Sequence, residues 1–205
     1  MKKRIASLLL FMGLISSVVA QVEYVNPIIG TDGMGHTFPG ACVPFGIVQL
    51  SPDTDTIPHN LNGVYQKKVY EYCAGYRYND PTIVGFSHTH FNGTGHSDLG
   101  DILIMPTTGE LKLNPGTSDH PENGYRSRFS HDTEKSVPGY YEVMLDDYHV
   151  KAQLTATPRV GVHLYLPPQG KQVDGSNYPM LHRQGHQNPF PWLRPADSSM
   201  PLLYW

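Results

Sequence analysis

The amino-acid sequence predicts an all-β fold, most consistent with an antiparallel β-sandwich. Two stretches, residues 150–155 and 160–165, alternate along the chain in the way that is typical of strands with one buried face. The 205 residues include 20 glycines, 18 prolines and 13 tyrosines, a composition that favours strands and loops over helices. No stretch after residue 20 keeps the spacing of an amphipathic helix.

Short apolar or alternating runs mark the expected strands, taken in chain order. They cover residues 22–29, 44–50, 83–86, 102–105, 125–129, 139–145, 150–155 and 160–165. The last three are predicted to form an antiparallel meander with one buried face. Between the strands, residues 57–68 are polar and aperiodic, and 109–116 is a hairpin-like passage that ends in the turn signal Asn114-Pro115-Gly116.

Residues 1–20 have the organisation of a secretory signal. Lys2, Lys3 and Arg4 precede an apolar core, and Val18-x-Ala20 is a small-residue cleavage site. The apolar run is shorter than the ~20 residues that a membrane span needs, so no membrane association is expected after cleavage. The mature protein is therefore expected to be secreted, to a periplasm or to the outside. The net charge of -3 argues against a nucleic-acid partner.

Cys42 and Cys73 are the two cysteines of the chain. In an oxidising compartment they would either pair, which stabilises a fold by ~3–4 kcal/mol on loop-entropy grounds, or stay free. The sequence leaves both alternatives open, because spacing does not show whether two cysteines are close in space.

The regular pattern stops near residue 167. Residues 167–205 carry many prolines and no alternation, and we expect a disordered or non-native tail after a domain that spans 21–166. One interpretation is a coil linker, but a linker seldom ends on a sequence such as Leu202-Leu203-Tyr204-Trp205. We hypothesise instead that this tail is out-of-frame translation after a frameshift near Leu166. An intact single reading frame on resequencing would contradict that hypothesis.

A glycine-rich loop over residues 30–40 is the first candidate site. Its four glycines permit positive φ and close backbone approach, but no Gly-Lys-Ser/Thr ending supports a phosphate cradle. One interpretation folds this loop over a sugar ring, with Asp32 and His36 bonding hydroxyls and Phe38 packing on an apolar sugar face. The alternative is a solvated surface loop.

The stretch from residue 83 to residue 101 is the second candidate site, because an apolar run there is followed by hydroxyls, imidazoles and glycines. His88 and His90 are two positions apart, so in an extended segment both would point to one face. With His96, Asp98 or Asp101 they would suit a catalytic zinc. The alternatives are polar residues that satisfy one another at the sandwich rim, and recognition of sugar hydroxyls.

A cluster of four tyrosines around Gly75 is the third candidate. Tyrosines on a loop stack on sugars and donate hydrogen bonds, and they equally line the edge of a sandwich. The cluster consists of Tyr70, Tyr72, Tyr76 and Tyr78.

Several ordered motifs between Tyr24 and Tyr165 resemble the N-terminal domain of glycoside hydrolase family 92, the exo-acting α-mannosidases, many of them α-1,2-specific. The motifs are Gly30-Thr31, His36-Thr37-Phe38-Pro39-Gly40-Ala41, Pro44-Phe45-Gly46, Gln49-Leu50-Ser51-Pro52-Asp53, Gly75-Tyr76, Gly85-Phe86-Ser87-His88-Thr89-His90, Gly93-Thr94-Gly95 and Gly100-Asp101. The resemblance implies an N-terminal β-sandwich followed by a helical (α/α) toroid, with a calcium-dependent active site between them. It also implies an inverting mechanism, in which an acid and a base lie about 6.5–9.5 Å apart.

In the family that this sequence resembles, the acid, the base and most of the calcium shell come from the helical domain. The expected function is therefore that of an N-terminal fragment, which supplies one wall of a pocket for a mannose-containing glycan and is inactive alone. No catalytic residue and no metal ligand is assigned within the chain. The alternative is a free-standing carbohydrate-binding β-sandwich without catalysis. The substrate-binding residues expected by motif match and residue chemistry are Asp32, His36, Phe38, Tyr76, His88, Thr89, His90 and Asp101.

Overall fold

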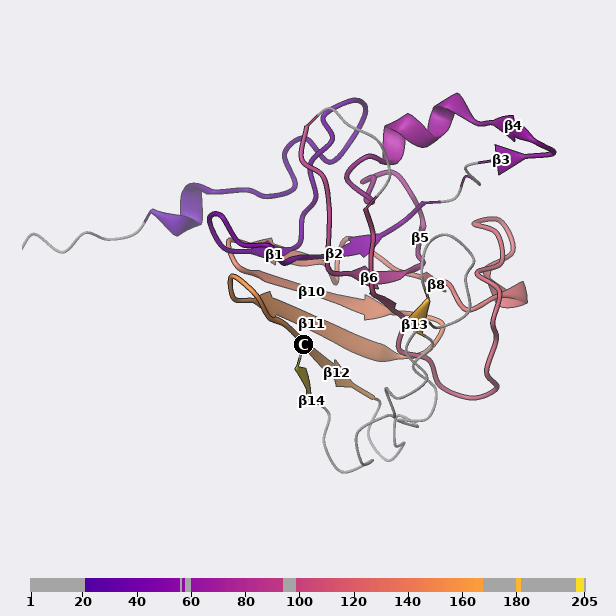
Figure 1. Cartoon of the computed structure of the whole chain (residues 1–205). Helices are drawn as coiled ribbons and strands as arrows, with labels where there is room; N and C mark the ends of the chain where they lie inside the picture. The colour runs from indigo at the N-terminus through magenta and orange to yellow at the C-terminus, as the bar shows by residue number, and fades with distance from the viewer. Residues whose placement is uncertain are drawn as a thin grey trace, which may run out of the picture.

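Two five-stranded antiparallel sheets face each other as a sandwich in the computed structural model, which describes residues 21–55, 57, 60–93, 99–167, 180–181 and 202–204 (Figure 1). This confirms the all-β prediction. The first sheet has the order β1 (Ala41–Cys42), β2 (Gln49–Asp53), β6 (Gly85–Ser87), β7 (Leu103–Ile104) and β13 (Met180–Leu181). The second has the order β14 (Leu202–Tyr204), β12 (Gly161–Leu166), β11 (Val150–Ala156), β10 (Tyr140–Leu145) and β9 (Lys135–Val137).

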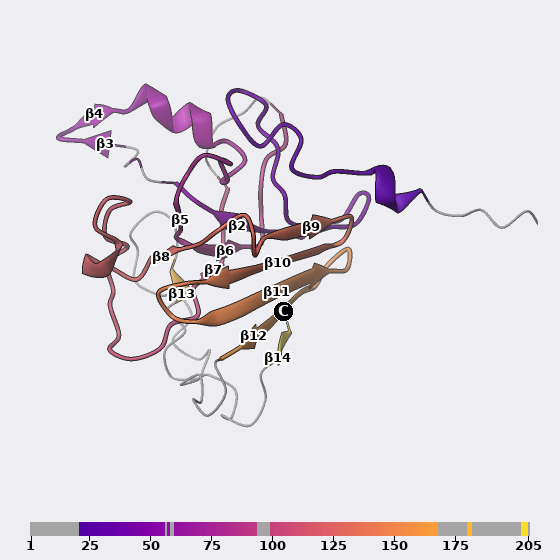
Figure 2. The same ribbon diagram turned by 180° about the vertical axis from the view of Figure 1, so that it is seen from behind.

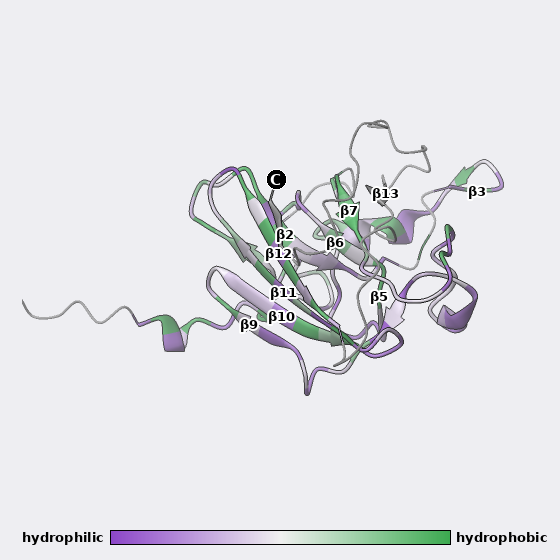
Figure 3. Ribbon diagram, turned by 90° about the horizontal axis from the view of Figure 1, so that it is seen from below, coloured by the Kyte–Doolittle hydropathy of each residue, from purple (hydrophilic) through white to green (hydrophobic). Residues whose placement is uncertain are grey.

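The predicted meander forms the centre of the second sheet. Tyr141 lies opposite Leu154, and Leu154 lies opposite His163, so one residue from each strand meets on the buried face. The alternate residues of these strands are buried, and hydrophobic stretches recur along β10, β11 and β12 (Figure 3). Against this face pack Leu50 of β2 and Phe86 of β6, both fully buried. The core therefore lies between the two sheets, as alternation requires.

Smaller elements surround the sandwich. They are the 3₁₀ helices η1 (Val22–Tyr24), η2 (Lys67–Tyr72) and η3 (Pro121–Asn123), the hairpin of β3 (Asn60–Leu61) and β4 (Val64–Tyr65), and the pair of β5 (Thr82–Ile83) and β8 (Ser127–Arg128). Figure 2, seen from behind, shows η2 and the β3–β4 hairpin beyond the first sheet, on the side away from the second sheet. The outer face of the first sheet is therefore covered by loops and η2.

Several expected strands are absent, shortened or divided. The expected strand over 83–86 is divided at Val84 between β5 and β6, which belong to different sheets, and that over 125–129 is reduced to β8. Residues 57–68, expected to be a loop, contain the β3–β4 hairpin and the start of η2.

Residues 22–29 form η1 and a turn, because Pro27 has no amide hydrogen for a ladder and the Asn26 carboxamide accepts from the Ile28 amide at 3.0 Å. Of the expected strand over 44–50, only the end lies in β2. Its beginning is a turn, in which the Gly46 amide donates to the Val43 carbonyl at 3.0 Å and Phe45 has a φ of 60°.

The stretch 167–205 contributes two short strands to the sandwich. β13 pairs with β7, and β14 pairs with β12, both in antiparallel register. Most of the rest of this stretch, like the expected signal at residues 1–20, lies outside the described residues, so the frameshift hypothesis stays a prediction. Within the part of the chain that is described, no helix has the length and apolar character to cross a membrane.

Candidate functional site

Three segments that carry predicted site residues meet over the outer face of the first sheet, and we call them the three-loop cluster (Figure 1). They are residues 30–40, residues 70–80, and residues 88–101 with 94–98 outside the described part. The Gly93 amide donates to the His36 carbonyl at 2.8 Å, and the Tyr78 amide donates to the Thr31 carbonyl at 3.0 Å. Candidates that are widely separated in the sequence therefore lie in one region.

A buried polar layer supports this cluster. In β2, Leu50 points into the core, so Ser51 and Asp53 point outward beneath the loops. All three side chains are buried, and the Ser51 hydroxyl has no hydrogen-bond partner among the described residues. A buried polar atom in this condition is expected to bind water or a ligand.

His90 joins this polar layer to the 30–40 loop. Its Nδ1 lies 2.7 Å from the Gln49 carbonyl oxygen, which only accepts, so Nδ1 carries a hydrogen. Its Nε2 lies 3.1 Å from Ser87 Oγ and 3.3 Å from Asp53 Oδ1. The ring of Phe38 packs on the imidazole with centroids 5.3 Å apart. Phe38 is therefore supported from below by a ring that β2 holds in place.

His36 is the second imidazole of the cluster. It adopts a φ of 49°, is 6% exposed, and meets the Tyr70 ring edge-on with centroids 4.8 Å apart. Its Nε2 is buried and has no hydrogen-bond partner within the described ranges. This nitrogen is therefore available to a polar ligand group or a water.

Thr89 and Asp101 close the 88–101 segment on itself. The Thr89 hydroxyl donates to Asp101 Oδ2 at 3.2 Å, and the Asp101 amide donates back to that hydroxyl at 3.0 Å. The Gly100 amide also donates to the Thr89 carbonyl at 2.8 Å. The Asp101 carboxylate is thereby held against Thr89, the chain neighbour of His90.

His88 lies beneath the cluster, inside the sandwich. Its Nδ1 lies 2.9 Å from the Ile102 carbonyl oxygen and its Nε2 lies 3.2 Å from His163 Nε2 of β12. Burial lowers the pKa of His88, which is 4% exposed. The two imidazoles of the His88-Thr89-His90 stretch thus contact different groups, rather than sharing one face as an extended segment would predict.

Asp32 is exposed to solvent, whereas Tyr76 is buried. The exposed Asp32 carboxylate accepts from Asn79 Nδ2 at 2.7 Å and lies 3.9 Å from Arg77 Nη2. Tyr76 is 2% exposed, and its hydroxyl donates to Glu134 Oε1 at 2.9 Å. The structure therefore brings Asp32, His36, Phe38, Thr89, His90 and Asp101 to the three-loop cluster, and it places Tyr76 and His88 in the interior.

Sequence reasoning did not find Glu134. This carboxylate accepts from Tyr76 at 2.9 Å and from Tyr141 at 2.6 Å, and its Oε2 lies 2.5 Å from His131 Nδ1. The alternation of its strand places Tyr141 on the buried face. Because a buried phenol needs a hydrogen-bond acceptor, Tyr141 predicts that some acceptor lies nearby. Neither spacing nor composition identifies which residue supplies that acceptor.

The described residues do not fit a metal site. No group of three or more His, Cys, Asp or Glu side chains that would hold an ion is found among them. His96 and Asp98, two of the ligands considered for zinc, lie outside the described residues. Cys42 and Cys73, both within the described residues, are not joined by a disulfide in this structure, and burial raises the pKa of the Cys42 thiol.

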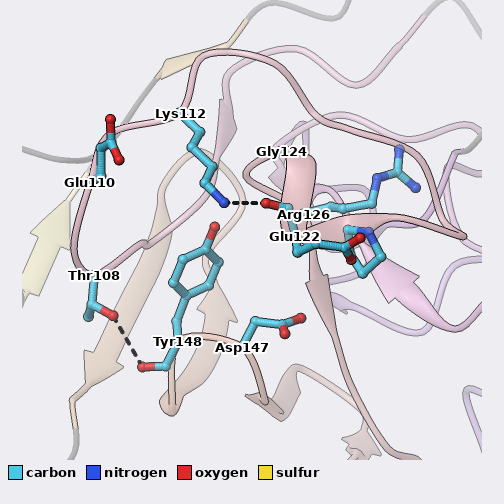
Figure 4. A pocket seen from close by; sticks show the side chains of 9 residues that line it. Thr108, Glu110, Lys112, Glu122, Gly124, Arg126, Asp147 and Tyr148 are labelled. Carbon is cyan, nitrogen blue, oxygen red and sulfur yellow. Dashed lines mark hydrogen bonds between the residues drawn. The ribbon is translucent and has the colours of Figure 1, made fainter.

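A pocket of about 300 Å³ lies elsewhere, between the 108–124 loops and the turn after β10 (Figure 4). Lys112 donates to the Glu122 carbonyl, and the Tyr148 carbonyl accepts from Thr108 at 3.5 Å. None of the predicted site residues lines this pocket. The candidate site therefore remains the three-loop cluster.

A known family matches most of the chain. The family model described as the glycosyl hydrolase family 92 N-terminal domain matches residues 24–186. A secreted glycosidase of Arthroderma benhamiae, itself uncharacterised, is 27% identical over 185 residues, which are 87% of this chain and 22% of that protein.

Solved structures give the same result. The chain is similar to a family GH92 α-mannosidase from Bacteroides thetaiotaomicron in complex with mannoimidazole, with 50% identity, a TM-score of 0.65, and coverage of 72% of this chain and 18% of that one. It is also similar to an inverting mannosidase of family GH92 from the same organism, with 27% identity, a TM-score of 0.54, and coverage of 76% and 19%. The chain spans about a fifth of the length of these relatives.

Proposed function

Because this chain belongs to glycosyl hydrolase family 92, whose N-terminal domain model it matches, we propose that its three-loop cluster is one wall of a pocket for the terminal mannose of a glycan. The observation that carries this proposal is the convergence of the three segments, joined by the Gly93–His36 and Tyr78–Thr31 backbone hydrogen bonds. The similar α-mannosidase whose structure contains mannoimidazole supports mannose as the sugar.

Most of the predicted residues in the cluster have a chemistry that suits a sugar. Phe38, supported by His90, offers an aromatic face to the apolar side of the ring. The carboxylates of Asp32 and Asp101 accept hydrogen bonds from hydroxyls, and His36 Nε2 is a buried polar atom that lacks a partner among the described residues. An aromatic face with a few convergent polar groups is the usual make-up of a small-molecule site. His88 and Tyr76 would act indirectly, by holding these segments from below.

We further propose that this chain binds mannose without hydrolysing mannosides on its own. Inversion needs a general acid and a general base on opposite sides of the bond, and each contributes roughly 10²–10⁴-fold. The family resemblance assigns both groups, and most of the calcium shell, to a helical domain. On that resemblance, calcium would be held mostly by the helical domain of a longer enzyme.

Secretion is part of the same proposal. The charged, apolar and small-residue segments of residues 1–20 support it, and so does the similarity to a glycosidase named as secreted. N-terminal sequencing of the exported protein tests it, with Gln21 expected as the first residue.

A pair of matched variants tests the sugar-binding proposal. Titration of the purified protein with methyl α-mannoside is expected to show saturable binding that Phe38→Ala weakens by about tenfold or more. Phe45→Ala is the control, because it removes the same side chain from an exposed turn. Equal affinities in the two variants would contradict the placement of the pocket. With added calcium, turnover of an α-mannoside at enzyme-like rates would contradict the proposed inactivity.

A further inference from the structure

The imidazole of His131 lies between two hydrogen-bond acceptors. Its Nδ1 is 2.5 Å from Glu134 Oε2, and its Nε2 is 2.8 Å from the carbonyl oxygen of Tyr78. A carbonyl oxygen never donates, and neither does an ionised carboxylate. If Glu134 is ionised, both ring nitrogens carry a hydrogen and His131 is an imidazolium.

Glu134 has the surroundings of an ionised carboxylate. Its Oε1 accepts the hydroxyls of both Tyr76, at 2.9 Å, and Tyr141, at 2.6 Å, while its side chain is only 3% exposed. Hydrogen bonds to the charged form favour that form. Burial and the charge of Glu134 raise the pKa of Tyr76 and of Tyr141, so both phenols keep the hydrogens they donate. With both phenol hydroxyls donating to this carboxylate, an N–H at Nδ1 of the imidazole is the matching donor for Oε2.

Aromatic rings hold the same imidazole in place. Tyr78 stacks on it with centroids 3.9 Å apart and planes 5° apart, and Phe129 meets it edge-on at 5.3 Å. A cation stacked on an aromatic face is favourable. Of the titratable groups, Glu134 from its own turn and Tyr78 from the 70–80 loop contact His131, whereas Tyr76 from that loop and Tyr141 from β10 contact Glu134.

The 70–80 loop, which contacts His131 through Tyr78, in turn positions Asp32 at the exposed edge of the three-loop cluster. Next to Tyr78, whose amide donates to the Thr31 carbonyl, Asn79 Nδ2 donates to Asp32 Oδ2 at 2.7 Å. We propose that His131, as an imidazolium, is a positioning residue that ties the 70–80 loop to the 130–134 turn and so sets the position of Asp32. The effect on sugar binding rests on the proposed function, whereas the effect on the loop does not.

When His131 loses a proton, one of its two hydrogen bonds, to Glu134 or to the Tyr78 carbonyl, is lost. A neutral imidazole has one N–H, so either Nδ1 faces the Glu134 carboxylate or Nε2 faces the Tyr78 carbonyl with lone pair against lone pair. The imidazole side chain is 35% exposed, so water and base reach it. The loop should therefore loosen as His131 loses its proton, and mannose affinity should fall over the same pH interval.

Nitrogen-15 NMR of the ring nitrogens between pH 5 and pH 9 tests the loop part in the wild-type protein. We expect an imidazolium signature for His131, and we expect the Tyr78 and Asp32 signals to move with the His131 titration. His120 is the internal control, because its 68% exposed side chain pairs with Glu122 away from the loop. A neutral His131 in the folded protein at pH 5, or Tyr78 signals that do not follow it, would overturn the inference.

Binding of methyl α-mannoside across the same pH range tests the link to the site. His131→Gln is expected to weaken binding by about fivefold at low pH and to flatten the pH profile, whereas His120→Gln should keep both. If no mannoside binds at any pH while the loop follows His131, the proposed ligand is wrong and the positioning role stands. If mannoside binds with one pH profile in all three proteins, the positioning role is wrong. Should His131→Gln fail to fold, the wild-type NMR titration still decides.

Discussion

His88 and His163 face each other across the interior of the sandwich, with their Nε2 atoms 3.2 Å apart. His88 Nδ1 donates to the Ile102 carbonyl, so a neutral His88 accepts at Nε2 from the Nε2–H of His163. That leaves His163 Nδ1 as the acceptor for the Tyr165 hydroxyl at 2.7 Å. These hydrogen bonds therefore define one neutral tautomer for each imidazole. A second proton on either imidazole would break one of the hydrogen bonds in this series.

Stability should fall as the pH drops below the ordinary histidine pKa. Burial lowers the pKa of His163, with a further contribution from His88, and burial also lowers the pKa of His88. The unfolded state therefore takes up protons first, near pH 6.5, and stability is lost from there downward until the folded state is also protonated. For each pH unit by which folding lowers a histidine pKa, the free energy of unfolding falls by ~1.4 kcal/mol over this range. Urea unfolding at a series of pH values between 8 and 4.5 measures this loss.

The matched variants for this experiment are His163→Gln and His120→Gln. His163→Gln removes one member of the His88–His163 pair, so its free energy of unfolding should depend less steeply on pH than that of the wild type. His120 is exposed, and its replacement should leave the slope unchanged. Parallel pH curves for His163→Gln and the wild type would show that the pair does not titrate as argued.

Gly75→Ala should destabilise the protein much more than Gly139→Ala. Both glycines have a φ of +78°, which costs a residue with a Cβ roughly 1–2 kcal/mol. A Cβ on Gly75 would also lie 2.3 Å from Asp53 Oδ1 and 2.8 Å from His90 Cδ2, whereas a Cβ on Gly139 meets nothing within 4 Å. The overlap should add about 1–3 kcal/mol. Chemical denaturation measures both, and equal losses would mean that the loop carrying Gly75 does not press on Asp53 and His90.

Tyr76→Phe should cost more stability than Tyr140→Phe. The Tyr76 hydroxyl donates to a buried carboxylate, so its loss should cost about 1.5–3 kcal/mol. The Tyr140 hydroxyl donates to Glu142 at 2.5 Å on the outer face of β10, where Lys151 and Gln153 also contact that carboxylate. Its loss should cost under about 1 kcal/mol. A larger loss for Tyr140→Phe in thermal unfolding would contradict the role given to Glu134.

The meander could be predicted from the sequence because strict alternation with a buried face fixes both strand and register. Val143 and Ala152 illustrate this, as both are buried and lie opposite each other in β10 and β11. The first sheet was less predictable, because its strands are only two to five residues long and turns interrupt them. Phe45 is the clearest case, because it belongs to an apolar run in the sequence, yet the turn in the backbone exposes its side chain to solvent.

The candidate site could be predicted only at the level of which segments matter. Glycines, imidazoles and carboxylates marked two of the segments and a cluster of tyrosines marked the third, and the structure brings all three together. The direction of each side chain depended on contacts that are distant in sequence, such as His163 beneath His88 and Glu134 beneath Tyr76. No local pattern specifies such partners, so residues expected at the surface of the site lie under it.

The most direct test of the central claim is a titration of the ¹⁵N-labelled protein with methyl α-mannoside, followed by amide chemical shifts. The account predicts saturable shifts concentrated at residues 30–40, 88–93 and 99–101, with smaller changes at 76–80. Shifts confined to the outer face of β10 and β11, to the pocket around Tyr148, or to no residue at all would contradict the claim that the three-loop cluster is a wall of a mannose pocket.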